Sequence, residues 1–589
     1  MRGSAAFRTG VAPGGALAPG WVKNELYRKA RAVPSLDLRF ADNKLLTDAI
    51  TGANLVTFTR ASTGTFVGSN GLIQSAVTNL LLRSEELDNA SWIKQSSVSV
   101  SANTTVAPNG TLTADTITWT SASVNTGIYA QILSGLAVSV AHTRSIYVRA
   151  DSAGGTVQLT DPTLTVGITT INLTTEWQRI ELTENTPIAG SAGVWVRKTA
   201  SSPNTIYLWG AQLEQSSTVG EYIPTTSTIN SAPRFDHNPT TGESLGLLVE
   251  ESRTNLLLRS EELDNASWNK AASSVSANAI ASPFGTTTAD KLIEDSALAQ
   301  HYIWQLVNVT ASSSYTISIY AKAAERSEVY LSLSTFNSAF LSGVDAYFNL
   351  SNGTIRGSGV NATAQISSTG NGWYRCSVSG TAQITTAAII NAAATSNGTT
   401  FFYIGDGTSG LFLWGAQLEA GAFATSYIPT ATATVTRAAD VASITGTNFS
   451  SFYNQTEGTV FAEAISVATN TSVFSISDNS TNNRIQLETG SNTRRFRITS
   501  SGSARYDNSV SYTFGTQGKT VGAYLDTSTN HATNGTLGSS STASPLPVVD
   551  RIYIGSNAAG SFPNNGTIKR LVYFPTRLPN NTLQAISQP

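Results

Sequence analysis

Charged residues are scarce in this chain: Asp, Glu, Lys and Arg make up 13% of its 589 residues, and the formal net charge is -2. Proteins that bind nucleic acid usually present a basic face, so this balance argues against such a role. The single cysteine, Cys376, excludes an intramolecular disulfide and a zinc site built from cysteines. We expect it to be a small buried apolar side chain within a strand.

Long apolar runs and common catalytic motifs are also missing. The sequence has no run of about 18 or more apolar residues, which predicts no membrane insertion. It contains no Gly-x-Ser-x-Gly turn, no His-Glu-x-x-His pair and no phosphate-binding loop, and its four histidines occur in unrelated contexts. We therefore expect no catalytic residues and predict that the protein is not an enzyme.

Apolar residues nevertheless make up 40% of the chain, which is enough for real cores, and Ser, Thr, Asn and Gly are abundant. Short runs that alternate apolar and polar residues, such as Thr170–Leu173 and Tyr315–Ile319, are typical of half-buried strands. Turn residues separate these runs. The pattern favours an all-β protein built of sandwiches or barrels.

The strongest feature is an internal duplication. The segment Thr78–Trp92 recurs without a single change as Thr254–Trp268, and both copies end with Leu-Trp-Gly-Ala-Gln-Leu-Glu followed by Tyr-Ile-Pro-Thr. Units of this size are independent tandem domains rather than the short repeats of a solenoid. We predict two jelly-roll sandwiches, residues 78–230 and 254–432, in which the matching first and last strands lie side by side.

The regions outside the duplication differ from it. Residues 433–589 contain a series of clean alternating runs and predict a third sandwich of another type. Residues 35–77 predict a short β connector of paired strands with a turn at Ser69–Gly71. Residues 231–253 are expected to form a linker between the two copies.

The N-terminal residues 1–34 predict an extended arm. They are rich in Gly, Ala and Pro, and they hold six Lys or Arg against one acid, Glu25. Residues 21–32 can form a short basic helix that stops before Pro34. An arm of this kind has little core of its own, so it is either solvated or ordered by docking onto another subunit.

The duplicated motif and the closing Leu-Trp-Gly-Ala-Gln-Leu-Glu resemble a module of tailed-bacteriophage virion proteins. That module looks like a jelly roll of the carbohydrate-binding-module type and occurs in tail fibres and head-decorating proteins. The C-terminal region resembles a concanavalin A-like (LamG-type) sandwich, and the resemblance covers roughly residues 35–589. It implies tandem jelly-roll sandwiches, a concanavalin A-like C-terminal sandwich and an extended N-terminal arm.

The resemblance also implies a function. It points to a bacteriophage virion structural protein on the particle surface, and a tail fibre or similar appendage is the preferred interpretation. Such a fibre would attach to other virion proteins through residues 1–34, form a homotrimer and bind host cell-surface glycan by avidity. A capsid decoration protein, either cement or head fibre, is the first alternative. A polysaccharide-degrading tailspike is the second.

Sugar-binding sites usually combine exposed aromatic rings with amides. The tryptophans shared by both copies lie within apolar alternation, which favours core packing. Aromatic residues found only in the second copy, and polar or aromatic residues of the C-terminal region, are better candidates. These candidates are Tyr302, Trp304, Phe336, Phe340, Arg494, Arg495, Tyr506, Asp507 and His531.

Two sets of acidic residues recur in both copies: Asp88, Asp115, Asp264 and Asp290, and the pairs Glu85–Glu86 and Glu261–Glu262. Sandwiches of both resembled types often hold a structural calcium ion, which is one interpretation of the aspartates. The other is that each accepts backbone N–H groups in a turn. Glycoside hydrolysis needs two facing carboxylates, but we interpret the glutamate pairs as structural. No other cofactor is expected.

Overall fold

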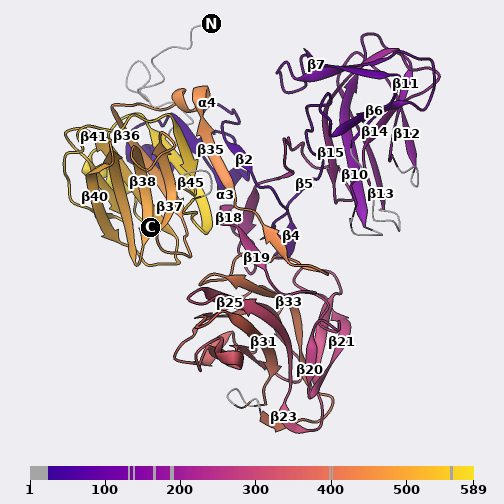
Figure 1. Ribbon diagram of the computed structural model, residues 1–589. Coiled ribbons are helices and arrows are strands. Elements are labelled where there is room, and N and C mark those ends of the chain that lie inside the picture. The colour runs from indigo at the N-terminus through magenta and orange to yellow at the C-terminus, as the bar shows by residue number, and fades with distance from the viewer. Residues whose placement is uncertain are drawn as a thin grey trace. The chain divides into compact units, whose positions relative to one another are not determined.

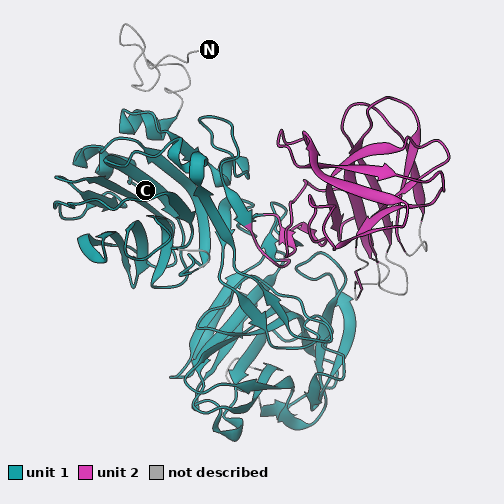
Figure 2. Ribbon diagram, turned by 45° about the horizontal axis from the view of Figure 1, so that its top comes forward, with its two compact units in different colours: residues 1–58, 64–75, 233–589 teal, residues 59–63, 76–232 magenta. Residues whose placement is uncertain are grey.

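The computed structural model describes residues 24–130, 133–134, 136, 140–162, 167–185, 192–396, 400, 402–557 and 561–589. Strands dominate it (Figure 1), which confirms the all-β prediction. The chain divides into two compact units (Figure 2): residues 59–63 and 76–232 form the smaller one, and the rest forms the larger one. None of the helices in the described ranges has the length and hydropathy needed to cross a bilayer.

The smaller unit, here called module 1, is a sandwich of two antiparallel sheets. One sheet has the order β13 (Gln178–Asn185), β10 (Ala141–Arg149), β15 (Thr205–Glu214), β8 (Ala114–Trp119) and β7 (Val98–Thr105). The other has the order β12 (Ile168–Asn172), β11 (Thr156–Thr160), β14 (Trp195–Lys198), β9 (Gly127–Ala130) and β6 (Trp92–Lys94). Alternate residues of both sheets, such as Val148 and Val157, meet in one buried core.

Module 2, within the larger unit, repeats this plan. One sheet has the order β21 (Ser273–Ile280), β22 (Ala289–Glu294), β33 (Gly410–Ala420), β25 (Ser314–Ala323), β30 (Trp373–Thr381) and β29 (Thr363–Ser368). The other has the order β20 (Asn269–Ala271), β24 (Tyr302–Val309), β31 (Thr386–Ala394), β26 (Glu328–Leu333), β27 (Asp345–Asn349) and β28 (Thr354–Ser358). A small pair, β23 (Leu298–Gln300) and β32 (Phe402–Ile404), lies outside these two sheets. Cys376 is fully buried in the core, as its sequence context predicts.

The ends of each module lie side by side as predicted, but mostly as turns rather than strands. In module 1 the repeated motif contributes β5 (Thr78–Asn79), which pairs with β16 (Asn230–Ser231), and Trp92 at the start of β6. In module 2, β19 (Arg253–Asn255) pairs with β34 (Val435–Arg437). Asn79 explains the proximity. Its amide nitrogen donates to the carbonyl oxygens of Ala211 (2.9 Å) and Ile223 (2.8 Å), both in the closing motif.

The C-terminal sandwich also consists of two sheets. Its first sheet has the order β17 (Arg234–His237), β18 (Ser244–Val249), β45 (Gly566–Phe574), β36 (Glu457–Ala464), β41 (Gly518–Leu525), β42 (Asn530–Thr533) and β43 (Thr536–Leu537), and β1 (Leu36–Leu38) also pairs with β45. Its second sheet has the order β2 (Thr57–Thr59), β35 (Val441–Thr445), β44 (Arg551–Ile554), β37 (Thr471–Ser477), β38 (Arg484–Gly490), β39 (Thr493–Ser500) and β40 (Ser503–Ser511). Short helices α3 (Phe40–Asn43) and α4 (Gly446–Ser450) accompany these strands.

The segments predicted as a connector and a linker supply strands to this sandwich. Strands β1 and β17–β18 lie in its first sheet and β2 in its second, although the sequence suggested separate connecting segments. The physical reason is burial: Leu36, Leu38 and Leu247 are fully buried among residues of the C-terminal region. The predicted turn at Ser69–Gly71 is present, between β3 (Thr65–Val67) and β4 (Ile73–Ser75).

The predicted N-terminal helix is present as α2 (Glu25–Ala30), whereas residues 1–23 lie outside the described residues. Tyr27 and the other apolar residues of α2 pack in a cluster with α5 (Asn580–Ile586) and strands of the first sheet. Tyr27 also donates a hydrogen bond to Asp37 (2.6 Å), which pairs with Arg570 (2.7 Å). This part of the predicted arm therefore packs against the C-terminal sandwich of its own chain.

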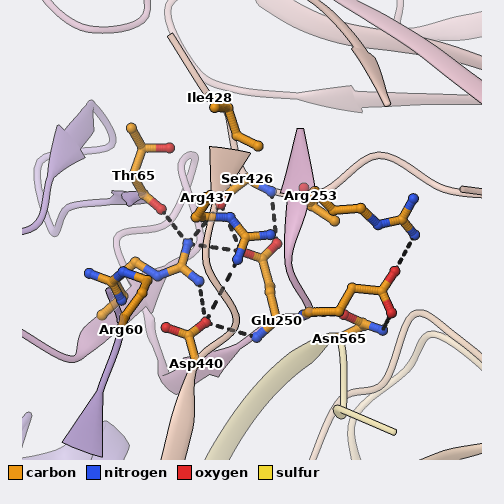
Figure 3. Close-up of polar contacts among 12 residues, drawn as sticks. Arg60, Thr65, Glu250, Arg253, Ser426, Ile428, Arg437, Asp440 and Asn565 are labelled. Carbon is orange, nitrogen blue, oxygen red and sulfur yellow. Dashed lines mark hydrogen bonds and ion pairs between the residues drawn. The ribbon is translucent and has the colours of Figure 1, made fainter. Parts of the chain in front are cut away.

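A buried ion network connects β17, the end of β18 and the segment after β34 (Figure 3). Arg234 pairs with Asp440 (2.5 Å) and Glu250 (2.8 Å), and Arg437 lies 3.5 Å from Glu250. Burial alone would raise the pKa of Glu250, but the charges of Arg437 and Arg234 and hydrogen bonds from Ser426 lower it to about 2. The two acids and two arginines balance in charge within the network, so we interpret it as structural.

Candidate functional site

One face of the second sheet of module 2 carries aromatic side chains that do not enter the core. Along β24, Ile303 is fully buried, whereas Tyr302 and Trp304 on either side of it are only partly buried and Leu306 is 53% exposed. Successive residues of a strand point to opposite faces, so Tyr302, Trp304 and Leu306 share the outward face. We call this surface the aromatic face.

Strand register brings further residues into two rows on the aromatic face. In the first row, Trp304 lies opposite Asn391, Asn391 opposite Ser332, and Ser332 opposite Asp345. The rows run across β24, β31, β26 and β27, so each contact joins residues distant in sequence. This row places an indole ring next to an amide, a hydroxyl and a carboxylate.

The second row is mostly aromatic. Tyr302 lies opposite Ala393, Ala393 opposite Tyr330, and Tyr330 opposite Tyr347. The rings of Tyr330 and Tyr347 have their centroids 4.7 Å apart at an interplanar angle of 47°. Ala393 contributes only a methyl group, so this row has a small residue between two tyrosines.

The chemistry of the aromatic face suits a ligand with both apolar and hydroxyl-bearing surfaces. Aromatic rings offer an apolar surface for contact, and the hydroxyls of tyrosine add a polar edge. Amide, hydroxyl and carboxylate groups nearby can fix a ligand's orientation by hydrogen bonds. Burial raises the pKa of Asp345, although a hydrogen bond from Tyr330 opposes the shift.

The aromatic residues that the sequence analysis selected because they occur only in the second copy lie in different environments. Tyr302 and Trp304 lie on the aromatic face, and Phe336 is 43% exposed in the short 3-10 helix η2 (Phe336–Ser338) after β26. Phe340 is buried in the core, which removes it as a candidate contact for a ligand. Sequence reasoning missed Tyr330 and Tyr347.

A strand-by-strand alignment of the two copies would have found these two tyrosines, because module 1 has Gln158 and Thr170 at the same places. The equivalent face of module 1 is arranged differently. Trp195 lies opposite Tyr129, with ring centroids 6.0 Å apart, and is only 6% exposed. The Arg197 guanidinium lies 5.3 Å from the Trp195 ring.

The recurring aspartates stabilise turns. Asp290 accepts hydrogen bonds from the backbone N–H groups of Leu263 (2.7 Å) and Asn278 (2.9 Å), and Asp115 accepts the equivalent pair in module 1. Asp88 and Asp264 each present a backbone carbonyl oxygen to a lysine. Within the described ranges, no group of three or more His, Cys, Asp or Glu is placed to hold a metal ion. The geometry favours the turn interpretation.

The glutamate pairs are also engaged in structural contacts. Glu85 accepts a hydrogen bond from Tyr222 (3.1 Å), and Glu86 pairs with Arg83 (2.9 Å). Glu261 and Glu262 make the same contacts in module 2. Burial raises the pKa of Glu85 and of Glu261. Each pair thus connects its motif to neighbouring residues, which agrees with our structural interpretation.

The candidates in the C-terminal sandwich lie on opposite sides of its second sheet. Arg494 is 1% exposed, donates to the Ala464 carbonyl oxygen (3.0 Å) and stacks on Tyr512, and Tyr506 is 4% exposed. Their burial leaves Arg494 and Tyr506 no surface to offer a ligand, which corrects the sequence-based choice. Asp507 is exposed and pairs with Arg495.

His531 is fully buried, and burial lowers its pKa to about 4. It lies beside Tyr506 in the interior, so it too has no surface for a ligand.

Comparison with known proteins gives no family: no protein-family model and no curated protein matches the chain. Similar solved structures include the tandem CBM22 domains of Xyn10C from Paenibacillus barcinonensis (14% identity, 59% of this chain and 98% of that chain, TM-score 0.20). Another is domain 4 of the arabinanase AbnA from Geobacillus stearothermophilus in complex with arabinotriose (14% identity, 29% of this chain and 84% of that chain, TM-score 0.22). A third is mouse laminin alpha1 LG4-5 (11% identity, 47% of this chain and 85% of that chain, TM-score 0.16). TM-scores this low carry no argument, so the fold assignment rests on the strand order itself.

Proposed function

We propose that this protein is a non-catalytic glycan-binding protein and that the aromatic face of module 2 is its binding surface. The observation that carries the proposal is the pair of neighbouring cross-strand rows: one holds Trp304 with amide, hydroxyl and carboxylate groups, and the other holds three tyrosines. A neutral sugar chain has apolar C–H faces and hydroxyl edges, and it complements both kinds of group.

The placement of these residues on paired strands supports the proposal further. Neighbouring strands of a sheet lie roughly 5 Å apart, so rows across β24, β31, β26 and β27 form a rigid and extended surface. An extended surface fits several units of a chain better than a single small molecule. Single-site affinity on such an open face is expected to be weak, and several copies of the protein on one particle would compensate by avidity.

The test is a glycan array probed with the full-length protein, followed by titration of the best neutral ligand. Trp304→Ala should weaken binding by tenfold or more, because a buried aromatic contact contributes about 2 kcal/mol. Tyr129→Ala, which removes the partly buried ring at the equivalent place in module 1, is the matched control and should leave binding unchanged. Binding of no neutral glycan, or equal binding by the Trp304 variant and the parent, would overturn the proposal.

The biological setting we propose is the surface of a tailed-bacteriophage virion, with the protein as a trimeric tail fibre or similar appendage. The support for this setting is the duplicated motif and its resemblance to phage modules. In this setting residues 1–34 would contact other virion proteins and the glycan would belong to the host surface. A capsid decoration protein is the alternative. Copy number per particle separates the two, because a fibre is present in tens of copies or fewer and a decoration protein in hundreds.

A further inference from the structure

The outward face of the second sheet of the C-terminal sandwich is polar on every strand from β44 to β40. Cross-strand register places Tyr553, Ser475, Gln486, Arg497 and Asp507 in one row. The alternate residues of the same strands, such as Phe474 and Phe496, are fully buried in the core. We call this surface the arginine face, for the reason that follows.

Arginines outnumber acids on the arginine face. Arg495 engages both acids, since it pairs with Asp507 and lies 3.3 Å from Glu488. Arg497 reaches Asp507 only at 3.9 Å. Arg484 has no acidic partner within ion-pair distance among the described residues, so the face keeps a local excess of positive charge.

Several buried polar atoms of the arginine face have no partner within the described part of the chain. They are Nε of Arg484, Nε of Arg497, Oε1 of Gln486 and Oγ of Ser475. Gln486 is 2% exposed and Ser475 fully buried. A buried polar group without a hydrogen bond costs about 1–3 kcal/mol, so a ligand in a cavity lined by Arg484 and Gln486 would gain by supplying the missing partners.

The same face is hollowed in two places. One cavity of about 310 Å³ is lined by Asn470, Thr471, Thr481, Arg484, Gln486, Glu488, Arg495, Asn557 and Phe562. A second of about 390 Å³ is lined by Asn470, Glu488, Thr489, Gly490, Thr493, Arg495, Asp507 and Ser509. They share Asn470, Glu488 and Arg495, so they lie next to each other on this face. Cavities of this size fall at the lower end of the range for small-molecule sites.

We propose that the arginine face binds an acidic polysaccharide, with a sugar carboxylate held by Arg484 and Arg497. Guanidinium groups bind carboxylates through paired, charge-assisted hydrogen bonds, which an ammonium group cannot match in geometry. The amide of Gln486, which lines the first cavity, complements a sugar hydroxyl. Glu488 also lies on this face and would repel densely charged polyanions. This combination favours a chain of uronic acids, in which each unit has one carboxylate and several hydroxyls.

The test compares polygalacturonic acid with its carboxyl-reduced form, which keeps the chain and removes the charge. The full-length protein should bind the acidic form, more weakly as salt rises, and should not bind the reduced form through this face. The double variant Arg484→Gln/Arg497→Gln should lose tenfold or more in affinity. The matched control, Arg83→Gln/Arg259→Gln, removes the same charge from partly exposed ion pairs and should bind like the parent.

Two further readouts separate this site from the aromatic face. Trp304→Ala should retain binding of polygalacturonic acid, and the arginine double variant should retain binding of the neutral glycan. Equal binding of the acidic and reduced chains, or unchanged binding by the arginine double variant, would overturn the proposal. So would a change in sedimentation of the double variant alone, because it would assign the arginines to contacts between copies.

Discussion

Trp304 of module 2 and Tyr129 of module 1 occupy the same place in their sheets: each lies opposite the residue that directly follows the tryptophan of the repeated motif. From that shared position the two outward faces diverge. Opposite Trp304 stands the amide of Asn391, whereas opposite Tyr129 stands Trp195, which is almost wholly buried. Equivalent strands therefore carry an open aromatic row in one module and a covered ring in the other.

The difference at the next row explains the covering. Module 2 has Ala393 between its tyrosines, whereas module 1 has Arg197 at that place. The Arg197 side chain lies over the Trp195 ring and donates a hydrogen bond to Gln158 (2.8 Å). Module 1 thus covers its tryptophan with Arg197, whereas Trp304 of module 2 stays partly exposed. The two copies therefore share the same sandwich framework, and a few outward-facing residues determine which copy can bind a glycan.

The largest effect should come from breaking the shared scaffold. The buried Asn255 amide donates to the Ala416 and Ile428 carbonyl oxygens and accepts from the Leu257 and Leu418 N–H groups, all within 3.1 Å. Asn79 makes the same four contacts in module 1. Replacing either asparagine with Ala leaves these buried backbone groups without hydrogen-bond partners. It should lower the free energy of unfolding by about 3 kcal/mol or more.

Hydrogen–deuterium exchange resolved by peptide measures this loss in each module separately. We expect equal loss of protection, confined to the module that carries the substitution, for Asn79→Ala and Asn255→Ala. Asn308→Ala, at an exposed position, is the control and should change nothing. A loss in one module several times larger than in the other would show that the copies do not share one scaffold.

Exchange of the residues that differ between the faces should have the next largest effect. Ala393→Arg introduces the module 1 arginine among the tyrosines of module 2 and should reduce neutral glycan affinity tenfold or more by covering the rings. Because Ala393 is only 1% exposed, the melting temperature is measured alongside to separate lost binding from lost stability. Ala393→Ser is the control for substitution itself. Retained affinity in Ala393→Arg would mean that the second row is not part of the binding surface.

The alternation of the sequence was sufficient to predict several central strands of the C-terminal sandwich, such as β36 and β39, but not which face each residue takes. Arg494 and Arg495 are neighbours in β39, and one is buried against Tyr512 while the other is paired at the surface. A shift of one residue in register exchanges the two faces of a strand. Only the partner strands fix that register, so sequence reasoning chose Arg494 and Arg495 together.

Long-range pairing also explains the incorrectly predicted linker. Strand β18 pairs with the nearby β17 and also with β45, more than 300 residues further along the chain, and only this second pairing places it in the C-terminal sandwich. The aromatic face was predicted in part for a related reason. The search for aromatic residues present only in the second copy found Tyr302 and Trp304, which lie in one contiguous segment. Tyr330 and Tyr347 join them only through strand pairing.

The smallest effect should come from pH, and it again separates the modules. Asp345 ends the first row of module 2, where module 1 has the apolar Ile168. Burial raises the pKa of Asp345 above its usual 3.8, so this carboxylate takes up a proton at a higher pH than an aspartate in water does. A protonated carboxyl is a poorer acceptor for a sugar hydroxyl. Neutral glycan affinity of the parent should therefore fall a few-fold as the solution is acidified from neutrality.

Asp345→Asn isolates this contribution, because its amide oxygen accepts a hydrogen bond at every pH. The affinity of the variant should not change over the same range. The raised pKa also means that ionisation of Asp345 disfavours the folded state. The substitution should then increase the free energy of unfolding at neutral pH, and the gain should vanish below the pKa of the unfolded chain. If the affinity of the parent protein does not fall on acidification, Asp345 does not contact the sugar. The functional difference between the modules would then rest on Trp304 and the second row alone.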